Sequence, residues 1–295
     1  MNIRLLSKKE FQRGQVLLIV VLVMVVSLTV GLSVATRTIT NLRLSTEEEQ
    51  SQRALSAAEA GIERALQSGS TEGTVVQDQE LSNDANISKV TVDQIVEAEF
   101  LINSGNKVTK NDGVDIWLST YSSDSDQNYA NPWTGELEVF WGSSSDSCLA
   151  NSSNTMAALE VVVLSGTKNN PTAKHFPVDP CTQRRANYNN FCPNSGNSEC
   201  PSYSSAGGSV SGKQFAYSFT IPVTSGLIAR IVPLYAGTAI GVKGRDGSGA
   251  GKTLPPQGTV IESIGTSGTT QRKITLYRGY PKVPTEFFPF MIFSP

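Results

Sequence analysis

The chain has 295 residues, and its 24 Lys and Arg nearly balance its 26 Asp and Glu, which leaves a formal net charge of −2 at pH 7. This length allows one or two domains with a sizeable core, and the small net charge gives no global field that would draw the protein onto nucleic acid or an anionic membrane. A single histidine, His175, excludes most His-based metal sites and every mechanism that needs two imidazoles.

The N-terminus combines a basic leader with an uncharged apolar run. Residues 1–14 carry four basic side chains and one acid, and no further charge occurs before Arg37. The run from Val16 to Ala35 is long enough to cross a bilayer core as a helix. Because basic residues precede this run and few follow it, the N-terminus is expected in the cytoplasm and residues 37–295 outside. The pattern fits a secretory signal cleaved after Ala35, a permanent single-span anchor, or a leader that is removed at Gly14.

The segment after the apolar run favours a continuous helix. Residues 36–67 contain no proline, so a helix is expected from about Gln15 to Leu66, on the order of 75 Å long. Cleavage after Ala35 would cut this helix at a point with neither turn nor linker. Small residues recur every three or four positions and form a stripe on one helix face, which suits close packing against a helix or a sheet. The stripe consists of Ala54, Ala57, Ala58, Gly61, Ile62 and Ala65.

This N-terminal region resembles a known family. The pattern RGQVLLIVVLVMVV, followed by RTITNLR and EEEQSQRALSAAEAGIERAL, is similar to minor type IV pilins of the PilX type and to type II secretion pseudopilins. The shared features are the leader ending at Gly14, the uncharged run, Arg37, Arg43 and the block Ala57–Glu63. The resemblance covers about the first quarter of the chain, with a much weaker likeness at IESIGTSGTTQRKITLYRGYP.

The resemblance implies how the N-terminus is processed and what it binds. A prepilin peptidase would cut between Gly14 and Gln15 and methylate the new N-terminus, although Gln15 replaces the more usual phenylalanine. The implied partners are this peptidase, other pilin subunits, the inner-membrane assembly machinery and membrane lipid. No nucleic acid, cofactor or metal is expected.

One position departs from the family pattern. Ordinary pilins carry a glutamate five residues after the cut, where this chain has Ile19. A carboxylate within a membrane is costly, so such a glutamate must offset its cost, for example by pairing with a neighbour's terminal amine. A subunit with Ile19 lacks that ion pair when it docks beneath another subunit. This absence favours a tip or initiating subunit over a repeating one.

The region after about Ser68 is expected to be rich in β-structure. Short apolar-alternating segments are separated by runs of Ser, Gly, Asn and Asp, which predicts strands and loops. The predicted strands are Lys89–Val96, Val114–Ser119, Glu136–Trp141, Ala157–Leu164, Gln214–Val223, Leu227–Tyr235, Thr238–Lys243, Gly258–Ile264 and Arg272–Arg278, the last two as a hairpin. Residues 142–154 and 165–212 are predicted as long surface loops. The predicted fold class is α+β: a leader over 1–14, a transmembrane and stalk helix over 15–67, and a β-rich extracytoplasmic region over 68–295.

Four cysteines lie in the exported region. Cys148, Cys181, Cys192 and Cys200 allow three disulfide pairings. Because Cys192 and Cys200 flank the turn-forming PNSGNSE, a disulfide is predicted between these two and a second one between Cys148 and Cys181. A zinc site is a poorer interpretation since no CxxC spacing occurs, and free thiols rank between the two.

Three further segments carry patterns that are partly typical of other functions. The stretch Gly244–Thr253 imitates a phosphate-binding loop, but Asp246 replaces a required glycine and two prolines follow where a helix must begin. The acidic loop Asp124–Glu136 imitates a calcium loop without the expected glycine and glutamate positions, which favours an ordinary solvated acidic loop over an irregular calcium site. The closing segment carries six apolar residues between prolines and is expected as a tail packed on the protein or as an exposed partner-binding strip. These six residues are Phe287, Phe288, Phe290, Met291, Ile292 and Phe293.

The sequence therefore predicts a structural and interaction protein and not an enzyme. The first hypothesis is a minor pilin or pseudopilin that takes part in type IV pilus assembly. It would be single-pass in the inner membrane and later at the cell surface or in the pilus. One alternative is a membrane-anchored surface adhesin or binding protein that never assembles. A second is an anchored exported hydrolase or metalloenzyme, which no constellation of residues supports.

Overall fold

The computed structural model describes residues 13–70, 72–81, 84–122, 129–148, 155–192, 200 and 202–283, with side chains from residue 16 onward. This part of the chain forms two compact units. The first comprises the chain up to Gly61 together with Gln77–Lys89 and Ser263–Ile274. The second comprises Ile62–Val76, Val90–Glu262 and the chain from Thr275 onward.

A single long helix, α1 (Arg13–Ser68), occupies the N-terminal region. Its 56 residues correspond to about 84 Å at 1.5 Å per residue, so the predicted unbroken helix from Gln15 to Leu66 is confirmed. Threonine hydroxyls within α1 donate hydrogen bonds to carbonyls one turn earlier, at 2.9 Å for Thr36, Thr38 and Thr40. These bonds satisfy the hydroxyl groups inside the helix itself, which suits an apolar environment.

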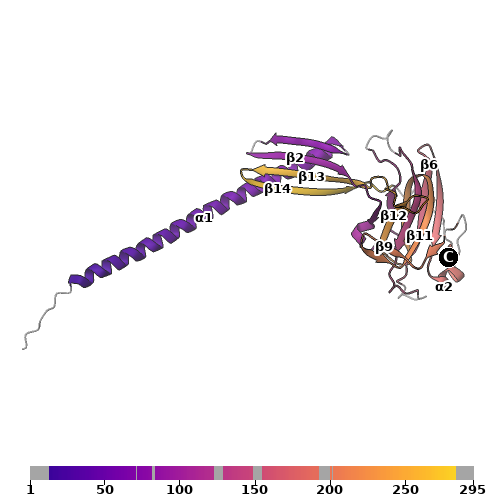
Figure 1. Ribbon diagram of the computed structural model, residues 1–295, viewed down its shortest axis with the longest axis horizontal. Coiled ribbons are helices and arrows are strands. Elements are labelled where there is room, and N and C mark those ends of the chain that lie inside the picture. The colour runs from indigo at the N-terminus through magenta and orange to yellow at the C-terminus, as the bar shows by residue number, and fades with distance from the viewer. Residues whose placement is uncertain are drawn as a thin grey trace, which may run out of the picture. The chain divides into compact units, whose positions relative to one another are not determined.

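A four-stranded sheet contributes to the helix-containing unit. Its order is β1-β2-β13-β14, and Figure 1 shows β2, β13 and β14 along the C-terminal part of α1. The strands are β1 (Gly73–Glu80), β2 (Ala85–Gln94), β13 (Gly258–Ser267) and β14 (Thr270–Gly279). The predicted hairpin is confirmed as β13 and β14, joined by a two-residue turn in which Gly268 has φ +54°. From Thr259 to Ser267 every second residue of β13 is buried, as expected for a sheet covered on one face.

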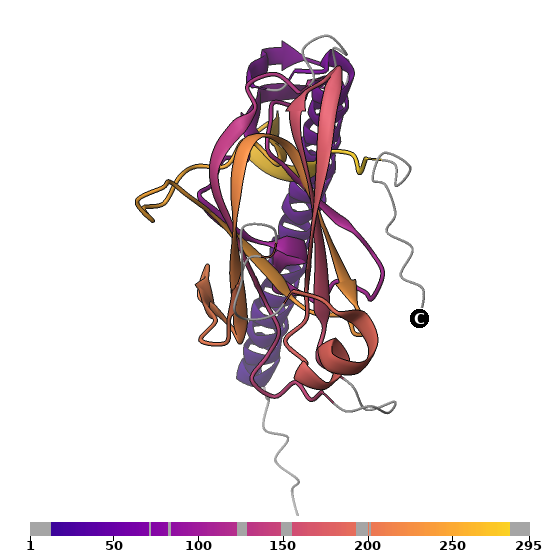
Figure 2. The same cartoon turned by 90° about the vertical axis from the view of Figure 1, so that its right-hand side faces the viewer.

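An eight-stranded sheet lies entirely in the second unit, and Figure 2 looks onto its long strands. Its main order is β3-β12-β5-β11-β6-β7, and β4 and β8 also pair with β11. The strands are β3 (Glu99–Leu101), β4 (Val114–Trp117), β5 (Trp133–Trp141), β6 (Ala158–Thr167), β7 (Asn170–Val178), β8 (Tyr203–Ser204), β11 (Tyr217–Leu234) and β12 (Ile240–Arg245). Short elements complete the unit: the 3₁₀ turn η1 (Ile102–Gly105), the hairpin β9 (Gly208–Val210) and β10 (Lys213–Phe215), the helical turn α2 (Thr182–Arg184) and the π-turn η2 (Arg185–Asn189).

Strand β11 corrects one prediction. The segments Gln214–Val223 and Leu227–Tyr235 were predicted as two strands, but β11 runs through both. The chain bulges between Val223 and Gly226, where the register with β5 shifts, and Ser225 adopts φ +50°. The apolar residues on both sides of the bulge are buried, so continuing the ladder past it is favoured over a turn. The first half of β11 pairs with β5 and the second half with β6 and β4.

The predicted loop over 165–212 is wrong where the chain forms β7 and, near its end, where it forms the short strands β8 and β9. Residues 170–178 form β7, which pairs with β6 from Asn170 opposite Thr167 to Val178 opposite Leu159. The polar composition of NPTAKHFPV was misleading because β7 is an outer strand whose residues near the turn face solvent. The same cause hid β1, where six of eight residues are exposed.

The core of the second unit lies among β4, β5, β6, β7, β11 and β12. It includes Trp133 and Trp141, whose indole N–H groups donate to the carbonyls of Thr253 at 2.9 Å and Ala157 at 3.1 Å. Fully buried side chains from four strands surround them: Leu137, Leu159, Ile221, Ile231 and Ile240. Both tryptophans are therefore buried with their indole N–H groups hydrogen-bonded.

Acidification is expected to weaken the β3–β12 edge of this sheet. The Lys243 ammonium bonds to the Glu99 carboxylate at 2.6 Å and lowers its pKa, and the Ser211 N–H adds a hydrogen bond at 2.9 Å. Because the folded-state pKa of Glu99 lies below its ordinary value, this stabilisation is present at neutral pH and is lost as pH falls through the folded pKa. We expect Glu99→Gln to cost about 0.2–1 kcal/mol at pH 7, as for other partly exposed pairs. Urea unfolding should show this cost at pH 7 and a smaller one at pH 3; an equal cost at both values would contradict the assignment.

Candidate assembly surface

The N-terminal half of α1 presents a large apolar surface. Every large apolar side chain from Val16 to Leu44 is more than half exposed, with Val26 lowest at 52%. α1 is long and apolar enough to cross a membrane. An apolar surface of this extent needs lipid or protein to cover it.

The residues predicted for processing and docking lie along this part of α1. Gly14 and Gln15 belong to its first turn, and their side chains fall outside the described set. Ile19 is 58% exposed, and Arg37 and Arg43 are also exposed, near the end of the apolar run. Their roles in cleavage and assembly stay predictions.

The small-residue stripe lies on the buried face of the second half of α1. Ala54, Ala57 and Ala58 are completely buried, Gly61 and Ala65 are buried, and Ile62 is half-buried. Gly265 on β13 is the reason why the approach is so close. A Cβ atom at that position would lie 2.1 Å from the Ala54 carbonyl oxygen and 2.5 Å from the Ala58 nitrogen. The middle of the stripe therefore packs helix to sheet within one subunit, and its role between subunits stays a prediction.

Both predicted disulfides are present. Cys148 pairs with Cys181 and Cys192 with Cys200, with Cα–Cα distances of 5.6 Å and 5.3 Å. They close loops with sequence separations of 33 and 8 residues, one ending just before α2 in the chain and the other beginning after it. Disulfides are typical of oxidising compartments outside the cytoplasm.

Removing the two disulfides is expected to have unequal effects. In the chain-entropy description the longer loop of Cys148–Cys181 corresponds to about 3.7 kcal/mol and the shorter loop of Cys192–Cys200 to about 2.5 kcal/mol. We expect Cys148→Ser/Cys181→Ser to lower the free energy of unfolding by about 1 kcal/mol more than Cys192→Ser/Cys200→Ser. Urea titrations of the two double variants measure this difference. Equal losses would mean that loop length does not determine the contribution.

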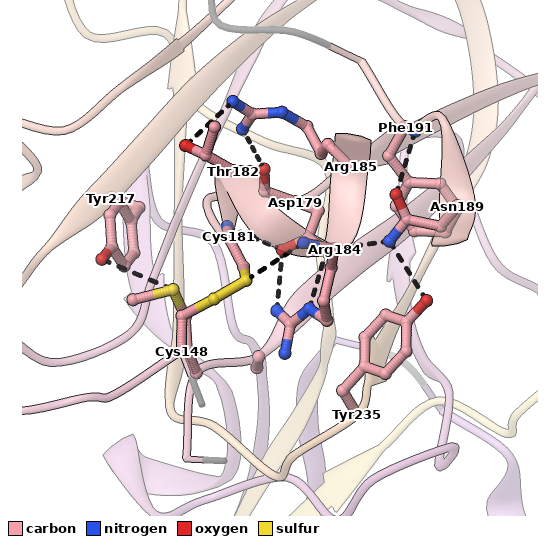
Figure 3. A network of polar contacts seen from close by, with 12 residues as sticks. Cys148, Asp179, Cys181, Thr182, Arg184, Arg185, Asn189, Phe191, Tyr217 and Tyr235 are labelled. Atoms are coloured by element: carbon pink, nitrogen blue, oxygen red, sulfur yellow. Dashed lines mark hydrogen bonds and ion pairs between the residues drawn. A yellow bond between two sulfur atoms is a disulfide. The ribbon is translucent and has the colours of Figure 1, made fainter. Parts of the chain in front are cut away.

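A buried ion pair lies beside the first disulfide (Figure 3). Asp179 is fully buried, and its carboxylate accepts hydrogen bonds from Arg184 at 2.9 and 2.7 Å, from the Cys181 N–H at 2.8 Å and from Asn189 Nδ2 at 2.8 Å. The Arg184 guanidinium stacks over the Tyr235 ring at 4.3 Å. Four donors on one carboxylate fix the turn that carries Cys181, and sequence reasoning missed this network because its members are ordinary polar residues of a loop-like segment.

The stretch that imitates a phosphate-binding loop is a turn that closes on its own carboxylate. Arg245 and Gly251 form a β-bridge, and the Asp246 carboxylate accepts the N–H groups of Ser248 at 3.0 Å and Ala250 at 2.9 Å. The pKa of Asp246 is lowered first by the hydrogen bond from the Ser248 hydroxyl at 2.7 Å, and further by those from the Ser248 and Ala250 N–H groups. The amides that would face a phosphate therefore bind a fixed internal anion.

The remaining candidate sites can be placed only in part. His175 bonds to Glu160 at 3.0 Å, and among the described residues no cluster of three His, Cys, Asp or Glu is placed to hold a metal. The acidic side chains Asp124 and Asp126 lie outside the described residues, as do all six apolar residues of the closing segment. The chain just before that segment packs on the second unit, where Tyr280 and Val283 lie against Trp117 and its neighbours.

No protein-family model matches the chain, and neither a curated protein nor a solved structure gives a match.

Proposed function

We propose that this protein is a minor pilin-like or pseudopilin-like subunit of a type IV filament system. The observation that carries the proposal is the division of α1 into two halves. Its first half exposes every large apolar side chain, and its second half carries the small-residue stripe that packs on the subunit's own sheet. A helix built in this way projects one apolar segment for a membrane or for neighbouring helices, while its other end stays fixed to a folded domain.

The proposed mechanism is an exchange of apolar partners. The segment Val16–Leu44 would first lie in the inner membrane with the basic leader in the cytoplasm. After removal of the leader, the same surface would pass from lipid to the helices of other subunits, so that little apolar area meets water at any step. The β-rich units would remain outside, where both disulfides are stable. No catalytic reaction is part of this proposal.

The mature N-terminus tests the proposal. Protein from the native membrane fraction should start at Gln15 when its terminal peptide is measured by mass spectrometry, with or without methylation. The matched control is Gly14→Val, which should leave the leader in place. A start at Met1 would instead favour a permanently anchored surface protein, and a start at Thr36 would favour a secreted one.

A tip or initiating position is the finer part of the proposal. Ile19 cannot form the ion pair with a neighbour's terminal amine that a glutamate would form, and it leaves an apolar side chain 58% exposed on α1. Ile19→Glu should therefore move the subunit from the tip into the body of the filament, as seen by immunogold labelling. Ile19→Val is the matched control. Unchanged tip labelling of the Glu variant would contradict the proposal that Ile19 determines the tip position.

A further inference from the structure

We propose that the outer edge of β14 binds one extended, acidic strand of a neighbouring filament subunit, which becomes a fifth strand of the four-stranded sheet. The identity of the partner as a filament subunit rests on the proposed function.

Strand β14 is a long and regular outer strand. It spans ten residues at the end of the order β1-β2-β13-β14, and no described strand pairs with its outer side. It contains no proline, and none of its residues has a positive φ. Such an edge presents a row of backbone donors and acceptors to another chain.

The other outer strands in the described part of the chain are each interrupted or short. β1 is broken by Asp78 at φ +46°, and β7 contains Pro171 and Pro177. The Pro177 carbonyl accepts the Cys192 N–H at 3.0 Å, so the backbone of Pro177 faces away from β6. Because proline has no N–H, the outer side of β7 lacks a backbone donor at this position. β3, β4, β8, β9 and β10 have only two to four residues. Proteins prevent edge pairing by such features and by charged side chains; β14 lacks the bulge, the proline and the short length, and its charged side chains oppose only a partner strand of the same charge.

The hairpin register identifies the outward groups. β13 ends at Ser267 and β14 begins at Thr270, so these two residues close a two-residue turn as a hydrogen-bonded pair. The pairing continues to Gly258 opposite Gly279, where a Cβ on Gly258 would meet the Arg278 carbonyl and the Gly279 Cα. Counting from the turn, Gln271, Thr275 and Tyr277 direct their backbone N–H groups away from β13. Tyr277 is 72% exposed, so a strand can reach this edge without displacing a side chain from a core.

The side chains of β14 select the charge of the partner. The strand carries Arg272, Lys273 and Arg278 and no acid. Arg272 donates to Ser51 Oγ at 2.8 and 2.6 Å, which holds its guanidinium on the α1 side of the strand. Arg278 shares that side because it lies six residues further along. A partner strand with alternating acidic side chains would place them opposite both guanidinium groups, where opposite charges stabilise cross-strand pairing and like charges oppose it.

A peptide pair tests the edge directly on the full-length protein in detergent micelles. The probe is a nine-residue peptide of alternating glutamate and valine, and the matched probe replaces each glutamate by lysine. At low salt we expect the acidic peptide to bind at least tenfold more tightly by fluorescence anisotropy. It should also slow hydrogen exchange at Gln271, Thr275 and Tyr277 while leaving β7 unchanged.

Two variant pairs separate backbone pairing from charge. Thr275→Pro removes an outward N–H and should abolish the protection of β14, whereas Thr275→Val keeps the N–H and should retain it. Arg278→Glu should reduce the preference for the acidic peptide at least tenfold, whereas Lys174→Glu, a charge reversal at an exposed lysine of β7, should not. Unchanged circular dichroism and melting of each variant would show that the fold is intact.

The outcomes distinguish this proposal from the proposed function. Equal protection by the acidic and lysine peptides, or protection that survives Thr275→Pro, would overturn the edge proposal even with a mature start at Gln15. Selective protection by the acidic peptide with a start at Met1 would support an acidic-strand site and overturn its assignment to a filament. In sheared filaments, Thr275→Pro should be depleted at least fivefold relative to Thr275→Val; equal incorporation would exclude a neighbouring filament subunit as the partner.

Discussion

Replacing Gly265 by alanine is expected to separate α1 from β13. The added Cβ would lie 2.1 Å from the Ala54 carbonyl oxygen, 2.5 Å from the Ala58 nitrogen and 3.0 Å from the Ala57 Cβ. Two of these atoms belong to the helix backbone and cannot rotate away, so the helix and strand must move apart. We expect a loss of about 3 kcal/mol, at the upper end of what overpacking costs. Hydrogen exchange of the β2 and β13 amides in the full-length protein measures the effect.

The matched control for this substitution is Gly279→Ala. A Cβ on Gly279 meets nothing within 4 Å, and its φ is not positive. It should change the exchange rates of β2 and β13 little. Equal effects of the two substitutions would mean that the loss at Gly265 comes from strand glycine in general and not from the close approach to α1.

Replacing Asp179 by alanine is expected to destabilise the second unit strongly. The Arg184 side chain is only 10% exposed and would lose its counter-charge, while the Cys181 N–H and the Asn189 amide would lose their acceptor. Removing one partner of a buried ion pair costs about 3–5 kcal/mol because the other charge stays buried. Urea unfolding followed by the fluorescence of the tryptophans in this unit gives the change.

A surface pair and a double variant control this prediction. Asp112→Ala removes an exposed pair with Lys282 at 2.9 Å and should cost less than about 1 kcal/mol. Removing both charges with Asp179→Leu and Arg184→Met should recover part of the loss from Asp179→Ala alone. If the double variant is less stable than the single one, the hydrogen bonds of the turn outweigh the isolated charge.

The helix and the strands of the apolar regions could be predicted because their signals are local. The uncharged run, the absence of proline and the alanine stripe are each visible in one short window, and the helix was placed to within two residues at either end. The hairpin of β13 and β14 was found from its glycine-containing turn. The two disulfides were also paired as predicted, one of them from the turn between Cys192 and Cys200.

The missed features depend on contacts between distant residues. Strand β7 is polar where it faces solvent, and only its pairing with β6 makes it a strand. The Asp179 network depends on Cys181, Arg184 and Asn189 being brought to one buried carboxylate by a short turn that carries no regular pattern. Sequence reasoning identified the stripe around Ala57 but could not choose between a helix and a sheet as its partner. That choice is made by Gly265, more than two hundred positions further along the chain.

The backbone contact between Ile95 and the start of β13 determines where a whole domain could be exchanged in this chain. The Ile95 N–H donates to the Gly258 carbonyl at 2.9 Å, and the Gln257 N–H donates to the Ile95 carbonyl at 3.1 Å. The two ends of the segment 96–256 therefore lie at neighbouring backbone positions, an arrangement that tolerates domain insertion well. The segment between β2 and β13 is therefore an insertion into the four-stranded sheet, whose strands lie before and after it in the sequence. We expect that an unrelated domain with closely spaced termini can replace this segment while α1 and the four-stranded sheet still fold.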